Sequence, residues 1–103
     1  MPDKAWKATE RRVCRALGLD RIPVNGRPGP DGSGDWLCVQ IKHRKKVAKF
    51  LADTLATIRR QARPDQLGVV VLHEHGGRGD GDLVMMTLAD FAEWFGGTKT
   101  GDK

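Results

Sequence analysis

The stretch that decides the fold covers residues 29–44 and reads GPDGSGDWLCVQIKHR. It begins as a glycine-rich turn with acidic residues and continues, over residues 36–42, with the two-residue alternation that is typical of a β-strand. One face of this strand is apolar and is expected to be buried; it consists of Leu37, Val39 and Ile41. The other face ends in Gln40 and Lys42, and Asp31 precedes it. This arrangement suits a metal ion held beside a phosphate.

Upstream, residues 4–17 have the spacing of an amphipathic helix, and Gly18 is a typical residue for its end. The apolar side of this helix consists of Trp6, Val13 and Leu17. Glu10 points toward the same side, although burying an unpaired carboxylate is costly. We therefore expect either a salt bridge from Glu10 to an Arg of the same helix, or a carboxylate that leans over the rim of the core into a charged site.

Between this helix and the strand, residues 21–24 can form a short edge strand, because Pro23 cannot donate a hydrogen bond in the middle of a sheet. Residues 25–34 are dense in turn-forming residues, so no regular element is expected there. The phosphate-binding spacing GxxxxGK[ST] is absent from the sequence. This excludes the simplest kind of nucleotide-binding loop.

The second half of the chain alternates between helical and strand patterns. A helix is predicted over residues 45–62, with an apolar stripe that consists of Val47, Phe50, Leu51, Leu55 and Ile58. The apolar run at residues 67–72 predicts a central strand covered on both faces. A short strand over residues 82–86 can pair back with it as a hairpin, and Thr87 is a plausible N-cap for a last helix that ends at Phe95.

A strand, a helix and a further strand in succession predict a parallel pair with a right-handed crossover. The sequence therefore predicts the α/β class, with a small central mixed β-sheet flanked by helices. Residues 1–97 are expected to form a single domain and residues 98–103 a flexible C-terminal tail.

The composition favours an anionic partner. The formal net charge is +5 and the isoelectric point is near 9.6, as expected for a nucleic-acid-binding protein, although excess Lys and Arg also keep small proteins soluble. Cys14 and Cys38 have no metal-ligand spacing and are expected to be buried free thiols. No signal peptide or membrane span is recognisable, so we expect a cytoplasmic protein.

Five short segments together resemble a known family. They read KATER at residues 7–11, GR at 26–27, PD at 30–31, QIKHR at 40–44 and VVVLHE at 69–74. The set resembles the PD-(D/E)xK nuclease superfamily, and within it the small phage and actinobacterial proteins related to Holliday junction resolvases. The resemblance implies a restriction-endonuclease-like core and a homodimeric endonuclease that cuts branched DNA, such as a four-way junction, with Mg²⁺ or, in its place, Mn²⁺.

The resemblance also implies roles for individual residues. Asp31 matches the metal-binding Asp, Glu10 matches an acid on the first helix that completes the metal site, and the carbonyl of Ile41 is a further ligand. Lys42 matches the family Lys, which orients the attacking water and steadies charge on the phosphate. Residues expected to contact DNA are Lys7, Arg11, Arg27, His43, Arg44, Lys45, Lys46 and Gln61.

Gln40 departs from the pattern, because the family has Glu or Asp at this position. A neutral amide keeps one acceptor oxygen but lacks the charge that favours Mg²⁺. Three explanations compete: an engineered change that traps a substrate complex, a natural variant that still binds metal weakly, and a degenerate binding module. The fit of the neighbouring residues favours a preserved site disabled at one ligand.

Two other functions are compatible with the sequence. In the first, the protein is a non-catalytic nucleic-acid-binding domain whose cations grip phosphates while the acids only balance charge. In the second, it is a small interaction protein in which His73 and His75, two residues apart, bind a metal ion.

Overall fold

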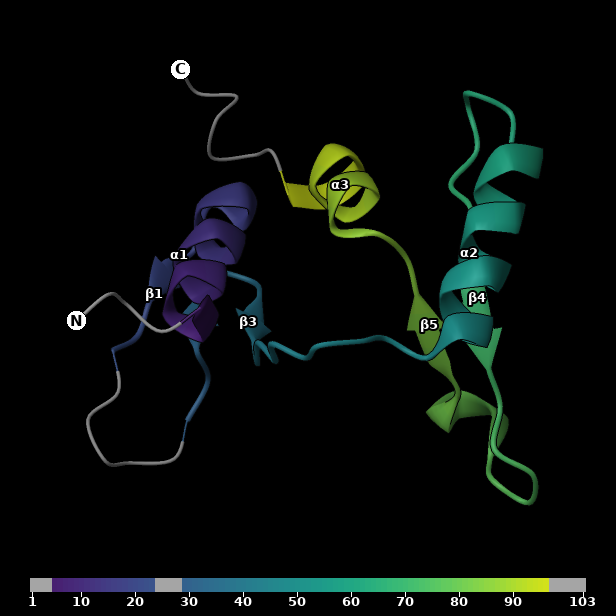
Figure 1. Ribbon diagram of the computed structural model, residues 1–103, viewed down its shortest axis with the longest axis horizontal. Helices are drawn as coiled ribbons and strands as arrows, with labels where there is room; N and C mark the ends of the chain where they lie inside the picture. Colours follow the sequence, from purple (N-terminus) through teal and green to yellow (C-terminus); the bar gives the residue numbers. More distant parts are fainter. Residues whose placement is uncertain (1–4, 24–28, 97–103) are drawn as a thin grey trace. The chain divides into compact units, whose positions relative to one another are not determined.

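The computed structural model describes residues 5–23 and 29–96. The chain divides into two compact units: unit 1 contains Met1–Arg44 and Ala92–Lys103, and unit 2 contains Lys45–Phe91. Figure 1 shows the elements of both units, coloured along the sequence. Arg27 and the expected tail over residues 98–103 lie outside the described residues, and the single domain expected over residues 1–97 remains a prediction.

Unit 1 begins with helix α1, Ala5–Leu17, which confirms the predicted helix. Its buried residues are Glu10, Cys14 and Leu17, spaced three and four residues apart on one face. Gly18 ends the helix with a positive φ of 69°. The N–H groups of Gly18 and Leu19 donate to the carbonyls of Arg15 and Cys14, which satisfies the last turn and redirects the chain into the sheet.

Three two-residue strands follow α1 and form one antiparallel sheet in the order β1-β2-β3. They are β1, Asp20–Arg21; β2, Gly32–Ser33; and β3, Cys38–Val39. The expectation that residues 25–34 contain no regular element is therefore wrong at β2. A Cβ atom on Gly32 would lie only 2.6 Å from Cys14 Sγ, so this glycine lets the sheet approach the helix closely.

The strand predicted over residues 36–42 is shorter than expected, because only Cys38 and Val39 pair in the sheet. Its alternation is nevertheless present: Leu37, Val39 and Ile41 are partly buried, whereas the even positions between residues 36 and 42 are exposed. Cys38 is therefore an exposed thiol rather than the predicted buried one, while Cys14 is buried as predicted. Its burial raises the pKa of the Cys14 thiol.

Unit 2 contains helix α2, Lys49–Gln61, whose buried Leu55 lies on the side that contacts the strand β4, Val70–Leu72. The helix starts later than the predicted residue 45, and Val47 and Phe50 are exposed rather than part of the core stripe. The cluster of like charges from Lys42 to Lys46 explains the late start, because such charges repel one another on a helix.

The strand β4 pairs with β5, Leu83–Met85, as an antiparallel hairpin, which confirms the predicted return strand. The described strands form two antiparallel sheets, so the expected single mixed sheet with a parallel strand pair is wrong. A hairpin partner is favoured because it closes a short loop, whereas a parallel partner requires a long crossover. The expected burial of both faces of β4 is also wrong, since Val71 is 58% exposed.

The last helical segment consists of α3, Leu88–Phe91, followed by a π-helical turn, η2, Ala92–Gly96. Thr87 Oγ1 accepts the N–H of Asp90 at 3.1 Å, which confirms the predicted N-cap. Phe95, near the end of this segment, is 43% exposed. No helix in the part of the chain that the structure describes is long and apolar enough to cross a membrane.

Gly32→Ala tests the close approach of the sheet to α1. We expect the free energy of unfolding to fall by about 1–3 kcal/mol, because the added methyl group overlaps Cys14 Sγ. Urea titration followed by tryptophan fluorescence measures this loss. Gly29→Ala is the matched control, since nothing lies within 4 Å of a Cβ atom there, and Cys14→Ala should restore stability to Gly32→Ala. Equal effects of the two glycine changes would contradict the packing argument.

Acid titration tests the contact between α2 and α3. Arg59 donates to both Asp90 carboxylate oxygens, at 2.8 and 3.1 Å, and these bonds hold the pKa of Asp90 below its usual value. A lowered folded-state pKa stabilises the fold above the unfolded-state pKa of about 3.9, and this contribution disappears as the pH falls through the folded-state pKa. Asp90→Asn should therefore lower the melting temperature at pH 7 but not in strong acid. Asp53→Asn, at an exposed pair with Lys49, is the control and should change it less at pH 7.

Candidate functional site

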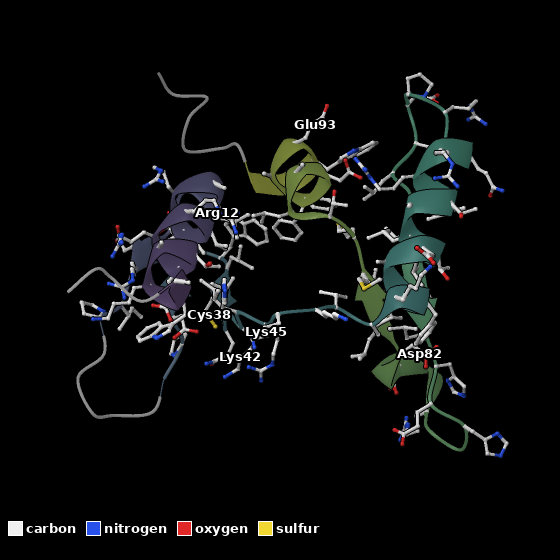
Figure 2. All side chains as sticks on the ribbon, in the orientation of Figure 1. Arg12, Cys38, Lys42, Lys45, Asp82 and Glu93 are labelled. Carbon is white, nitrogen blue, oxygen red and sulfur yellow. The ribbon has the colours of Figure 1, made fainter. Side chains whose placement is uncertain are left out.

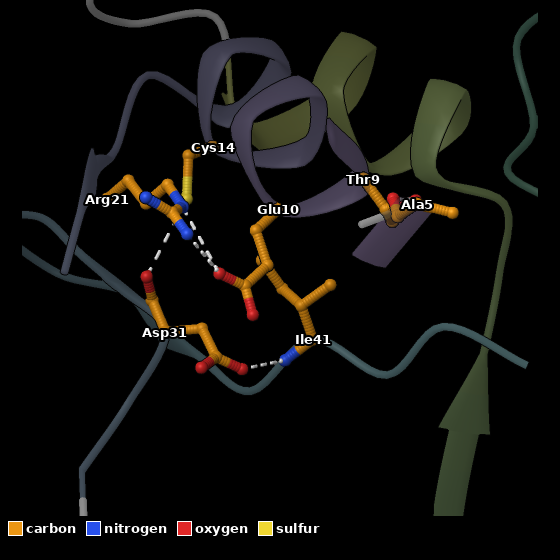
Figure 3. Close-up of polar contacts among 7 residues, drawn as sticks. All are labelled: Ala5, Thr9, Glu10, Cys14, Arg21, Asp31 and Ile41. Atoms are coloured by element: carbon orange, nitrogen blue, oxygen red, sulfur yellow. Dashed lines mark hydrogen bonds and ion pairs between the residues drawn. The ribbon is translucent and has the colours of Figure 1, made fainter. Parts of the chain in front are cut away.

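Among the described residues of unit 1, Glu10 is the charged residue that is buried, with 6% of its surface exposed. Its Oε1 accepts a hydrogen bond from Arg21 Nε on β1 at 3.1 Å and forms an ion pair with Arg21 Nη2 at 3.0 Å. The expected salt bridge therefore exists, but its cation comes from the sheet and not from the same helix. Figure 3 shows the Glu10 carboxylate pointing from α1 toward Asp31, with Arg21 beside it.

Asp31 is held by the backbone on both sides. Its N–H donates to the Val39 carbonyl at 2.8 Å, and its carbonyl accepts the Ile22 N–H at 2.9 Å. Its side-chain Oδ2 accepts the Ile41 N–H at 2.7 Å. These bonds join Asp31 to the segments before and after it in the sheet, so its carboxylate is placed beside the segment that carries Gln40 and Lys42.

The predicted site residues converge on one pocket of about 280 Å³. Its lining consists of Trp6, Glu10, Asp31, Gln40, Ile41, Lys42, His43 and Arg44. All of these residues belong to unit 1, and the Lys42 side chain, labelled in Figure 2, is exposed. The structure therefore brings together all four residues predicted to be catalytic, Glu10, Asp31, Gln40 and Lys42.

Thr9 fixes His43 at the edge of this pocket. Thr9 Oγ1 donates to the Ala5 carbonyl at 3.1 Å, and His43 Nδ1 lies 2.8 Å from the same Oγ1. Because the hydroxyl has one proton and uses it toward Ala5, Nδ1–H of His43 is the donor in the second bond. This contact anchors the segment after β3 to α1.

The donors in the pocket fit a hard cation by type. They are the carboxylates of Glu10 and Asp31, the amide oxygen of Gln40 and the carbonyl of Ile41, all oxygen donors of the kind that Mg²⁺ prefers. Within residues 5–23 and 29–96, each carboxylate uses only one oxygen in a hydrogen bond. No group of three or more His, Cys, Asp or Glu suited to a metal occurs in this part of the chain.

The residues expected to contact DNA are only partly gathered here. His43 and Arg44 line the pocket, Lys7 lies over the Trp6 ring at 5.6 Å, and Arg11 is exposed on α1. Lys45, Lys46 and Gln61 belong to unit 2 and are exposed, and Gln61 is the last residue of α2.

The positions of His73 and His75 do not support the hypothesis that they bind a metal ion together. His73 Nδ1 lies 2.6 Å from Asp82 Oδ1, at the loop end of the β4–β5 hairpin. His75 is exposed in the loop that follows.

The sequence did not point to Arg21 or Thr9 as site residues, or to Trp6 as a residue that lines the pocket. Only Glu10 carried a signal for one of them, because a carboxylate on an apolar helix face requires a cationic partner. No protein-family profile, curated protein or solved structure matches this chain. The function is therefore argued from the residues of the pocket.

Glu10→Gln and Asp31→Asn should differ in their effect on stability. Glu10→Gln removes the charge that balances Arg21 in a buried pair, so we expect the free energy of unfolding to fall by about 2–3 kcal/mol. Asp31→Asn keeps an acceptor for the Ile41 N–H and should cost about 1 kcal/mol. Urea titration of both variants measures the difference, and a larger loss for Asp31→Asn would contradict the assigned roles.

Proposed function

We propose that this protein binds DNA and that its pocket is a phosphodiester-hydrolysing site of the PD-(D/E)xK type, weakened by Gln40. The observation that carries the proposal is the convergence of Glu10, Asp31, Gln40 and Lys42 on one pocket. These residues come from α1, from the residue before β2 and from the segment after β3.

A restriction-endonuclease-like core is part of the proposal. The described elements begin with a helix, three antiparallel strands, a second helix and a further strand. The resemblance of the five sequence segments to the superfamily implies such a core. Asp31 directly precedes β2, and Gln40 and Lys42 follow the end of β3.

The roles of the side chains follow from their chemistry. Bound Mg²⁺ would neutralise phosphate charge and lower the pKa of a coordinated water. Glu10, Asp31, Gln40 and the Ile41 carbonyl supply the oxygen donors that hold the cation. The Lys42 ammonium group stabilises the negative charge that develops on the phosphate during attack.

Gln40 shifts the balance of the site from hydrolysis toward binding. The amide contributes an oxygen without a charge, so cation affinity and turnover fall. Removing a carboxylate also removes repulsion of the DNA phosphates, so affinity for DNA is kept or improved. His43, Arg44, Lys45 and Lys46 continue the positive charge along the chain and contact neighbouring phosphates.

A non-catalytic DNA-binding domain is the second candidate, and the neutral amide at position 40 is the observation that favours it. In that case binding depends on salt but not on Mg²⁺ or Asp31. The resemblance further suggests a homodimer acting on four-way junctions, because two cuts in opposing strands require two sites. The proposal includes a cytoplasmic location for the protein.

Restoring the carboxylate tests the proposal. The Gln40→Glu variant should cleave a synthetic four-way junction or linear duplex in the presence of Mg²⁺ or Mn²⁺, at a rate at least about 10²-fold above the original protein. Gel electrophoresis of labelled strands measures the rate, and comparing the two substrates shows the preference for branched DNA.

Two controls accompany this experiment. Adding Lys42→Met to Gln40→Glu should abolish cleavage, whereas Lys49→Met, a lysine outside the pocket on α2, should leave it intact. If Gln40→Glu cleaves neither substrate with Mg²⁺ or Mn²⁺, while DNA binding persists in EDTA, the non-catalytic candidate is correct instead.

A further inference from the structure

Arg21 is the charged residue behind the pocket to which the sequence assigns no role. It does not line the pocket, and its side chain is 23% exposed. Its Nε donates a hydrogen bond to Glu10 Oε1, and its Nη2 forms an ion pair with the same oxygen. In the described part of the chain no hydrogen bond engages Oε2, the second oxygen of this carboxylate. The guanidinium group thus holds Oε1 in place and leaves Oε2 for the pocket.

The strand that carries Arg21 is also hydrogen-bonded to the backbone at Asp31, the residue that bears the second carboxylate. Arg21 is paired with Gly32 in the register of β1 and β2, and the next residue, Ile22, donates its N–H to the carbonyl of Asp31 at 2.9 Å. The strand that carries the guanidinium group therefore also holds the chain at Asp31. Glu10 and Asp31 are set relative to each other through this one strand (Figure 3).

We propose that Arg21 is a positioning residue, which orients Glu10 so that its second oxygen binds a divalent cation together with Asp31. The inference rests on the proposed function, since it concerns the same pocket. An outer partner that fixes a ligand's orientation typically contributes 10- to 100-fold to metal affinity. A purely structural ion pair would instead contribute to stability and leave the cation affinity of the folded protein unchanged.

The test measures cation binding without DNA or cleavage. Terbium(III) is a hard, oxygen-seeking cation whose luminescence is sensitised by a nearby tryptophan, and Trp6 lines the pocket. Trp6→Phe should remove the signal and so assign it to this pocket. Arg21→Lys keeps the positive charge but loses the two-nitrogen contact to Oε1, so it isolates orientation from charge.

We expect Arg21→Lys to weaken terbium binding by about tenfold or more. Arg12→Lys, the same change at an exposed position of α1, should leave the affinity unchanged. Thermal melting of both variants shows the fraction folded. A folded Arg21→Lys protein with the affinity of the original, or an original protein without Trp6-dependent luminescence, would overturn the inference.

A measurement on the unsubstituted protein covers the case in which Arg21→Lys does not fold. Paramagnetic Mn²⁺ should broaden the NMR signals of Arg21 Hε and of the Ile41 N–H, which contact Glu10 and Asp31 respectively. Mg²⁺ at the same concentration is the diamagnetic control. An Arg21 Hε signal that stays sharp while the Ile41 signal broadens would show that Arg21 does not position the cation site.

The outcomes separate this inference from the proposed function. If Gln40→Glu fails to cleave DNA but the terbium and Mn²⁺ results are as expected, Arg21 positions a cation site that is not a nuclease centre. If Gln40→Glu cleaves DNA and Arg21→Lys changes neither cation affinity nor the Mg²⁺ concentration needed for cleavage, the nuclease stands and the role of Arg21 is refuted.

Discussion

Unit 1 depends on the solution to one electrostatic problem, the burial of the Glu10 carboxylate. A carboxylate with 6% of its surface exposed is tolerated only with a well-placed partner, because desolvation strongly disfavours an isolated charge. Arg21 meets this need with two nitrogens on one oxygen. The pair requires β1 to lie against α1, and the Gly18 turn brings the chain there. The ion pair can therefore form only if the turn at Gly18 and the position of β1 are both as observed.

The small sheet then positions the other residues of the pocket relative to Glu10 and Arg21. Its strands have only two residues each, so few ladder bonds hold it together. Side-chain bonds supplement the ladder: Asp31 Oδ2 accepts the Ile41 N–H, and His43 contacts Thr9 on α1. The residues that would do the chemistry are therefore among those that hold the local structure.

The charges around the pocket explain why position 40 matters so much. One of the two carboxylates is already balanced by Arg21, and Lys42 and Arg44 add positive charge at the lining. A third carboxylate would make the net charge of the pocket more negative and favour a cation. An amide leaves the net charge more positive, which suits a phosphate better. Under the proposed function, a single uncharged side chain at position 40 thus decides between a site that holds phosphate and one that also hydrolyses it.

The sequence by itself determined the features that depend on neighbours along the chain. The helix at α1, its end at Gly18, the β4–β5 hairpin and the Thr87 cap all follow from local periodicity, turn chemistry and capping. The same local signals drew attention to Glu10 as misplaced. Local patterns could not fix strand lengths or partners, so the predicted parallel pairing and the seven-residue strand were wrong.

Only the tertiary structure decided which residues meet. The cation that neutralises Glu10 could have been any arginine within reach, and helical spacing pointed to the wrong ones; the sheet register selected Arg21. In the same way, the sequence around Gly32 is typical of a turn, whereas in the fold Gly32 packs closely against Cys14. The physical reason is that burial and charge pairing depend on distances across the chain, which a sequence pattern of short range does not contain.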